Sequence, residues 1–194
     1  NGGDRWSKFT KNVPPVAVHY IELQSQTNDL VMGTHGRGVI IIDDISPLRE
    51  INEDNLSNKL YFFERDQFEI QEFGGFSDSF GRETQFFGAN PSLSCEIQYL
   101  LPKRHTFGKM TMEIQDMDGN KITTLNPGKS KGINTVNWSY NMRTPKIAKA
   151  KTLSFGGFTS PTVPAGDYKV VIKKGRDTFE KVINVAYKNN AGLS

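Results

Sequence analysis

The glycine-rich stretch from Gly33 to Gly38 carries two residues that could do chemistry, His35 and Arg37. Three glycines within six residues allow a tight turn and the close approach of another group. In a ligand-facing turn, the planar guanidinium of Arg37 would bind a carboxylate through two parallel hydrogen bonds. In the structural alternative, which we favour, both side chains hydrogen-bond carbonyl groups of the surrounding sheet.

Two adjacent carboxylates, Asp43 and Asp44, follow a short apolar run. Neighbouring side chains on a strand point to opposite faces, so this pair is poorly placed for general acid and base work. We expect a structural role, in which one of them forms an ion pair with Arg37 or Arg49. A calcium site is the less favoured alternative.

No metal or cofactor site is predicted. The segment Asp116–Asn120 begins like a calcium loop but lacks the later ligands and the glutamate, so a hairpin turn is expected from its Asp-Gly pair. His19, His35 and His105 do not have the spacing of metal ligands, and no glycine-rich phosphate loop precedes a helix. The single cysteine, Cys95, excludes an internal disulfide and is expected to be a small packed side chain.

The composition excludes several partners. The 194 residues carry 24 Lys and Arg against 21 Asp and Glu, a net charge of +3, which is too weak to indicate a nucleic-acid partner. The longest apolar run, Val39–Ile42, is far shorter than the roughly 18–20 residues of a membrane helix. Thirteen Phe and six Tyr are typical of an ordered, globular chain.

Residues 1–47 are predicted to form a β-meander, because short apolar runs alternate with polar turns. The Asn28-Asp29 pair separates the first two strands. Residues 40–42 do not alternate, so we expect their strand to be buried on both faces, as in a stack of sheets. Ser46 is expected to cap a short helix with Pro47 in its first position, and the helix should end near Asn52.

Residues 48–92 are predicted to contain that helix and a Phe- and Gly-rich connector, with a loop over 53–59, a short strand over 59–63 and mostly loop over 66–92. We expect the connector to pack against a surface. A sugar-stacking platform is the alternative for four of its aromatic residues: Phe76, Phe80, Phe86 and Phe87.

Residues 93–187 alternate between apolar and polar positions in about seven short segments separated by turns, the pattern of a β-sandwich. Trp138 is expected to lie in its core. A basic excursion over 141–163 is predicted to be a solvated loop, with contact to an anionic polymer as the alternative. Residues 188–194 are a tail.

Two stretches resemble a known family. Asn1–Trp6 resembles the end of an Asp-box turn, S-x-[DN]-x-G-x-T-W, with Asn1 in the acidic position and Arg5 departing from the usual Thr. Asn28–Leu48 is similar to the closing blade of sortilin-like, neuraminidase-repeat β-propellers, a group described broadly as glycosyl hydrolases. In those proteins a Gly-Thr-His-Gly-Arg-Gly stretch precedes an apolar strand and Asp-Asp.

The rest of the chain resembles the immunoglobulin-like C-terminal domain of the same proteins, which is similar to that of flagellar hook-cap proteins. Asn90-Pro91, the strand over 134–138 and Val163–Tyr168 carry this likeness. The resemblance implies an all-β fold: the last strands of a β-propeller in residues 1–47, followed by an Ig-like β-sandwich in residues 93–187.

The resemblance also implies a function. A propeller needs about four to eight four-stranded blades, so residues 1–47 cannot close one and we expect the chain to be a C-terminal piece. Its expected role is non-catalytic: closing the propeller and carrying the Ig-like domain. The alternative is an accessory part of a glycoside hydrolase whose unknown catalytic residues lie mostly in upstream blades. The expected partners are those blades and a glycan or polypeptide, and the implied setting is periplasmic or extracellular.

Overall fold

A computed structural model describes residues 3–4, 6, 8, 13–70, 94–144 and 160–188. The chain divides into two compact units, Asn1–Asn52 and Glu53–Ser194. The division lies a few residues beyond the boundary expected at residue 47. Across the described ranges the fold is mostly β-strand, as the sequence predicted.

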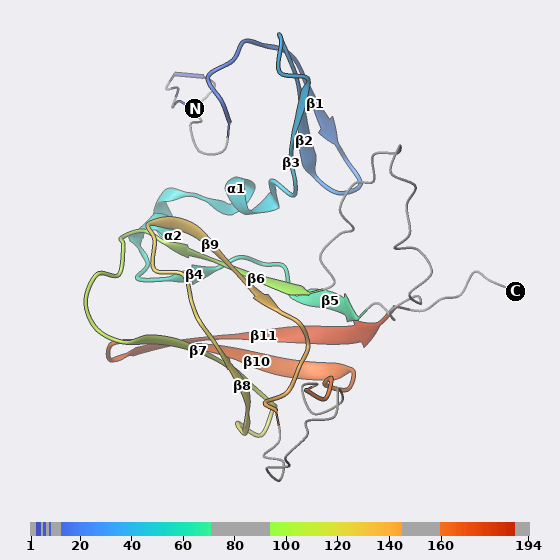
Figure 1. Cartoon of the computed structure of the whole chain (residues 1–194). Helices are drawn as coiled ribbons and strands as arrows, with labels where there is room; N and C mark the ends of the chain where they lie inside the picture. Colours follow the sequence, from blue (N-terminus) through green and yellow to red (C-terminus); the bar gives the residue numbers. More distant parts are fainter. Residues whose placement is uncertain are drawn as a thin grey trace, which may run out of the picture. The chain divides into compact units, whose positions relative to one another are not determined.

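The first unit contains an antiparallel sheet in the order β1-β2-β3 (Figure 1). Its strands are β1 (Val18–Gln24), β2 (Asp29–Thr34) and β3 (Val39–Ile42). The predicted meander is therefore confirmed. Asn28 adopts a φ of 59° at the turn between β1 and β2, a conformation that asparagine tolerates better than most residues.

The expectation that the strand of residues 40–42 is buried on both faces is wrong. Val39 and Ile41 are 64% and 57% exposed, whereas Ile40 and Ile42 are half-buried. A run of apolar residues still alternates once it forms a strand, because successive side chains point to opposite faces. On β3, therefore, Ile40 and Ile42 are the partly covered side chains.

Two short helices follow, α1 (Ser46–Glu50) and α2 (Glu53–Ser57). The predicted cap is wrong, because Ser46 lies inside α1 and no side chain at the N-cap residue, Ile45, makes a capping bond. Pro47 lies in the first turn, at the second helical position, one residue later than expected. Helix α2 replaces the predicted loop, and Glu53 in its first turn suits the positive end of a helix dipole.

The second unit contains two sheets (Figure 1). The smaller one has the order β4-β6-β9, with β4 (Tyr61–Phe62), β6 (Cys95–Leu101) and β9 (Gly132–Trp138). The larger one has the order β5-β11-β10-β7-β8, with β5 (Gln67–Ile70), β11 (Asp177–Tyr187), β10 (Gly166–Lys174), β7 (Met110–Gln115) and β8 (Lys121–Leu125). The alternating segments predicted between residues 93 and 187 are these strands, six in the described part.

Strand β5 corrects the sequence interpretation. Its residues were expected to be part of a loop-rich connector, but they pair in parallel with β11, from Asn184 opposite Gln67 to Tyr187 opposite Ile70. The four phenylalanines considered as a sugar-stacking platform lie outside the described residues, as do residues 145–159 of the basic excursion.

The inner faces of both sheets share one hydrophobic core. Trp138 lies in it, as predicted, with its ring edge-on to Tyr168 at 5.7 Å between centroids. The Trp138 indole N–H donates to the Asn141 carbonyl at 3.0 Å, and the Tyr168 hydroxyl donates to the Pro164 carbonyl at 2.6 Å. Cys95 is fully buried, and burial raises the pKa of its thiol to about 12, so it is the inert packed side chain that was expected.

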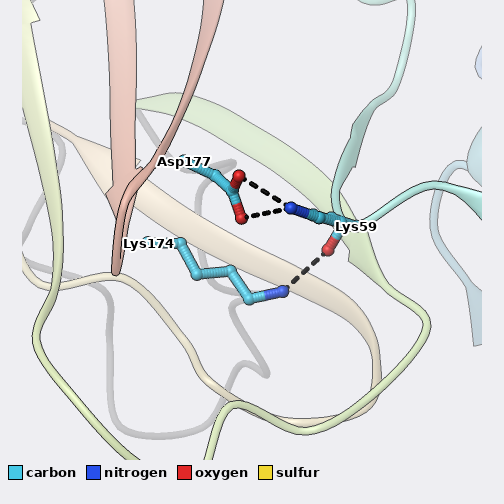
Figure 2. A network of polar contacts seen from close by, with 3 residues as sticks. All are labelled: Lys59, Lys174 and Asp177. Atoms are coloured by element: carbon cyan, nitrogen blue, oxygen red, sulfur yellow. Dashed lines mark hydrogen bonds and ion pairs between the residues drawn. The ribbon is translucent and has the colours of Figure 1, made fainter.

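Between β4 and β5 the chain crosses from the smaller sheet to the larger one, and lysines bind the carbonyl groups of this segment. The Lys181 ammonium donates to the carbonyls of Phe63 and Arg65. Figure 2 shows the neighbouring contacts, in which Lys174 donates to the Lys59 carbonyl at 2.8 Å and Lys59 pairs with Asp177 at 2.7 Å. These contacts join the crossing segment, and Lys59 just before β4, to the β10–β11 hairpin.

Two valines on adjacent strands allow a matched test of the shared core. Val170 is fully buried and Val182 is 48% exposed. We expect Val170→Ala to lower the free energy of unfolding by about 2–3 kcal/mol, because it removes buried methyl groups and leaves a cavity. Val182→Ala should cost less than about 1 kcal/mol. Chemical denaturation of both variants measures the difference, and equal losses would contradict the assigned core.

Candidate functional site

The glycine-rich stretch forms the turn that connects β2 to β3. Thr34 closes it, since its backbone N–H and its hydroxyl both bond to the Gly38 carbonyl, at 3.0 and 2.7 Å. Gly36 and Gly38 have φ angles of 81° and 67°, which residues with a side chain rarely adopt. The turn exposes the side chains of His35 and Arg37.

The structure brings His35 together with a residue that the sequence did not pair with it. The His35 ring lies 5.5 Å from the ring of His19, and the His35 backbone N–H donates to the Ala17 carbonyl at 3.0 Å. His19 and His35 are far apart in the sequence, so only the pairing of β1 with β2 could have revealed this contact.

Asp43 and Asp44 lie just after the end of β3. Asp43 is exposed, whereas Asp44 is half-buried and has a φ of 43°. The Asp44 carboxylate accepts the Ser46 backbone N–H at 3.1 Å, and the Asp44 N–H donates to the Asp29 carboxylate at 2.9 Å. Asp44 therefore supports the start of α1, where backbone N–H groups have no partner inside the helix.

Asp29 belongs to the same corner of the sheet. The Thr27 hydroxyl donates to its carboxylate at 2.5 Å, and this bond, followed by the one from the Asp44 N–H, holds the pKa of Asp29 below its usual 3.8. Asn28 adds a bond from its side-chain amide to the Ser46 hydroxyl at 3.0 Å. The β1–β2 turn is thus bonded to the segment that follows β3.

A second candidate site was missed by sequence reasoning: a pocket of about 400 Å³ in the second unit. It is lined by Arg65, Gln67, Phe68, Glu69, Ser94, Tyr140, Asn184 and Ala186. These residues come from four separate segments, so no local motif predicts the pocket. Its charged and aromatic side chains contact each other: the Arg65 guanidinium lies 5.2 Å from the Phe68 ring centre.

Tyr140 in this pocket is not arranged as a nucleophile. Its hydroxyl donates to the Glu69 carbonyl at 3.2 Å, and burial raises its pKa to about 12. The phenol therefore stays protonated at neutral pH. A smaller basic pocket of about 380 Å³ lies at the base of the 141–163 excursion, where Lys121 and Arg143 line it.

Within the described ranges, no three or more His, Cys, Asp or Glu side chains form a group able to hold a metal ion. The same part of the chain has no helix that is both long enough and apolar enough to cross a membrane. Comparison of the chain with protein-family models, with curated proteins and with solved structures gave no match.

Substitutions of Asp44 test its hydrogen bond to the Ser46 N–H. Asp44→Asn keeps a side-chain oxygen and a residue that tolerates positive φ, so the Ser46 amide should keep its protection from hydrogen exchange. Asp44→Ala loses both features, and we expect that protection to fall about tenfold. Asp44→Gly keeps the backbone conformation but loses the acceptor and should be intermediate. Equal protection in all three variants would contradict the assigned bond.

The pKa of Asp29 yields a second test. Because its folded-state pKa is lowered, the ionised carboxylate stabilises the fold above pH 3.8, and this contribution is lost as the pH falls through the lower folded value. Thr27→Val removes the hydroxyl whose hydrogen bond lowers the Asp29 pKa most. NMR titration of the Asp29 carboxyl in this variant should therefore give a midpoint closer to 3.8. Thr135→Val, in the second unit, is the control and should leave the midpoint unchanged.

Proposed function

We propose that this chain is a non-catalytic structural and interaction region, in which the first unit is the terminal blade of a β-propeller and the second an Ig-like sandwich. The observation that carries the proposal is the exposed apolar surface of the β1–β2–β3 sheet. Tyr20 and Ile21 are 64% and 62% exposed although they are neighbours on β1 and therefore point to opposite faces.

A propeller blade packs both of its faces against neighbouring blades, and each blade has four strands. The three-stranded sheet is one strand short of that number in the described residues. Exposed apolar side chains also occur on β3, at Val39 and Ile41. Exposed apolar patches of this kind mark surfaces that pack against other protein.

The strand order of the second unit supports the Ig-like assignment. If β6 and β9 are strands B and E, then β7, β8, β10 and β11 take the places of C, C′, F and G. The two short strands β4 and β5 then share the role of strand A, one in each sheet. Tyr168, near the start of β10, bonds back to the Pro164 carbonyl, as the tyrosine corner of strand F does.

Two features depart from antibody-type domains. Trp138 lies on the strand assigned as E, whereas antibody domains carry the core tryptophan on strand C. The single cysteine, Cys95, excludes the disulfide between strands B and F. The aromatic group of Trp138, Tyr140 and Tyr168 fills the core instead.

The test is association with the upstream blades that the proposal requires, produced as a separate polypeptide. We expect a one-to-one complex by size-exclusion chromatography with light scattering. Ile41→Lys should weaken it about tenfold or more, because a charge would be buried at the interface. Ile133→Lys, a partly exposed site in the second unit, is the matched control and should have no effect. No association, or equal weakening by both variants, would contradict the proposed blade.

Catalysis is tested on the same complex with sialosides and a panel of plant and host glycans. We expect no hydrolysis. Hydrolysis that is lost in Asp43→Asn would overturn the non-catalytic assignment and favour the glycoside hydrolase.

A further inference from the structure

Strand β1 contains a β-bulge at His19. Val18 lies opposite Thr34 and Tyr20 lies opposite Gly33, so His19 is an extra residue without its own partner on β2. A bulge leaves one residue outside the ladder and turns its side chain in a new direction. Here it lies at the end of the sheet where the glycine-rich turn begins.

The bulge and the turn together bring two imidazole rings into contact. The centroids of His19 and His35 lie 5.5 Å apart and the ring planes are tilted by 48°. Both side chains are exposed to solvent. Each imidazole has a ring nitrogen that can bind a metal ion when the ring is neutral.

Backbone features hold the pair in place. The His35 N–H bonds to the Ala17 carbonyl, which fixes the turn to β1 just before the bulge. A side chain at Gly33 would place its Cβ 3.3 Å from the Cβ of Tyr20, so glycine allows the strands to approach closely there. The positive φ angles of Gly36 and Gly38 then direct the chain back into β3.

We propose that His19 and His35 form a binding site for a transition-metal ion of the zinc class. Zinc binds imidazole nitrogen at about 2.0–2.1 Å in tetrahedral geometry, which places the centroids of two ligating rings roughly 5 Å apart. The observed centroid separation of 5.5 Å is close to this value. Water fills the remaining coordination positions.

The imidazole ligands determine which class of metal ion the site would bind. Imidazole suits Zn²⁺, Cu²⁺ and Ni²⁺, whereas Mg²⁺ and Ca²⁺ prefer oxygen ligands. No sequence motif predicts the site, because the spacing between His19 and His35 is not that of a metal-binding motif. The two ligands become neighbours through the strand register and the bulge.

The experiment is a titration of the full chain with Zn²⁺ in a neutral buffer that does not coordinate metals, followed by calorimetry and by NMR of the histidine ring protons. We expect one Zn²⁺ per chain and joint shifts of the His19 and His35 signals. His19→Gln and His35→Gln should each lower the affinity about tenfold or more, because one exposed imidazole holds the metal weakly. Mg²⁺ should give no shifts.

His105→Gln is the matched control, because it removes the remaining histidine, which lies in the second unit. It should leave the affinity and stoichiometry unchanged. Absence of Zn²⁺ binding, shifts of only one of the two histidines, or equal affinity in His19→Gln and the unsubstituted chain would each overturn the proposal. The ring-proton shifts of the unsubstituted chain show whether both histidines bind Zn²⁺, even if a variant folds poorly.

Discussion

The crossing of the chain between β4 and β5 is the constraint on which the second unit depends. β4 pairs with β6 in one sheet and β5 with β11 in the other, so the four residues between them must pass from sheet to sheet. The Asn184 N–H of β11 donates to the Asp66 carbonyl at 2.7 Å. Bonds of this kind matter at the crossing because unpaired backbone groups are costly when they are buried. Lys181 and Lys174 supply charged donors to the crossing and the residues just before it. With the crossing fixed, both sheets bury their inner faces in a common core.

The first unit is organised differently. Its sheet has three strands, and large apolar side chains on β1 and β3 stay exposed. Polar bonds from Asn28, Asp29 and Asp44 join the β1–β2 turn to the start of α1. A small sheet needs a packed apolar face for independent stability, which is the reason for our proposal that other protein covers it.

Local sequence patterns predicted the strands with alternating residues and the tight turns. Strand β7 alternates cleanly between buried and half-buried residues, and the turn at Asp116–Asn120 has the expected Gly119 with positive φ. Strand β5 could not be predicted, because it has only four residues and its partner lies more than a hundred residues away. Among the candidate site residues, His35 and Arg37 lie in the glycine turn as expected, but the contact of His35 with His19 depends on strand register.

The parallel pairing of β5 with β11 has a mechanical consequence. Tension applied through the chain on either side of the second unit would pull the start of β5 and the end of β11 in opposite directions along their common axis. The hydrogen bonds between the two strands would then be loaded together in shear instead of being opened one after another. The geometry of the β5–β11 pair is therefore one that resists stretching along the polypeptide.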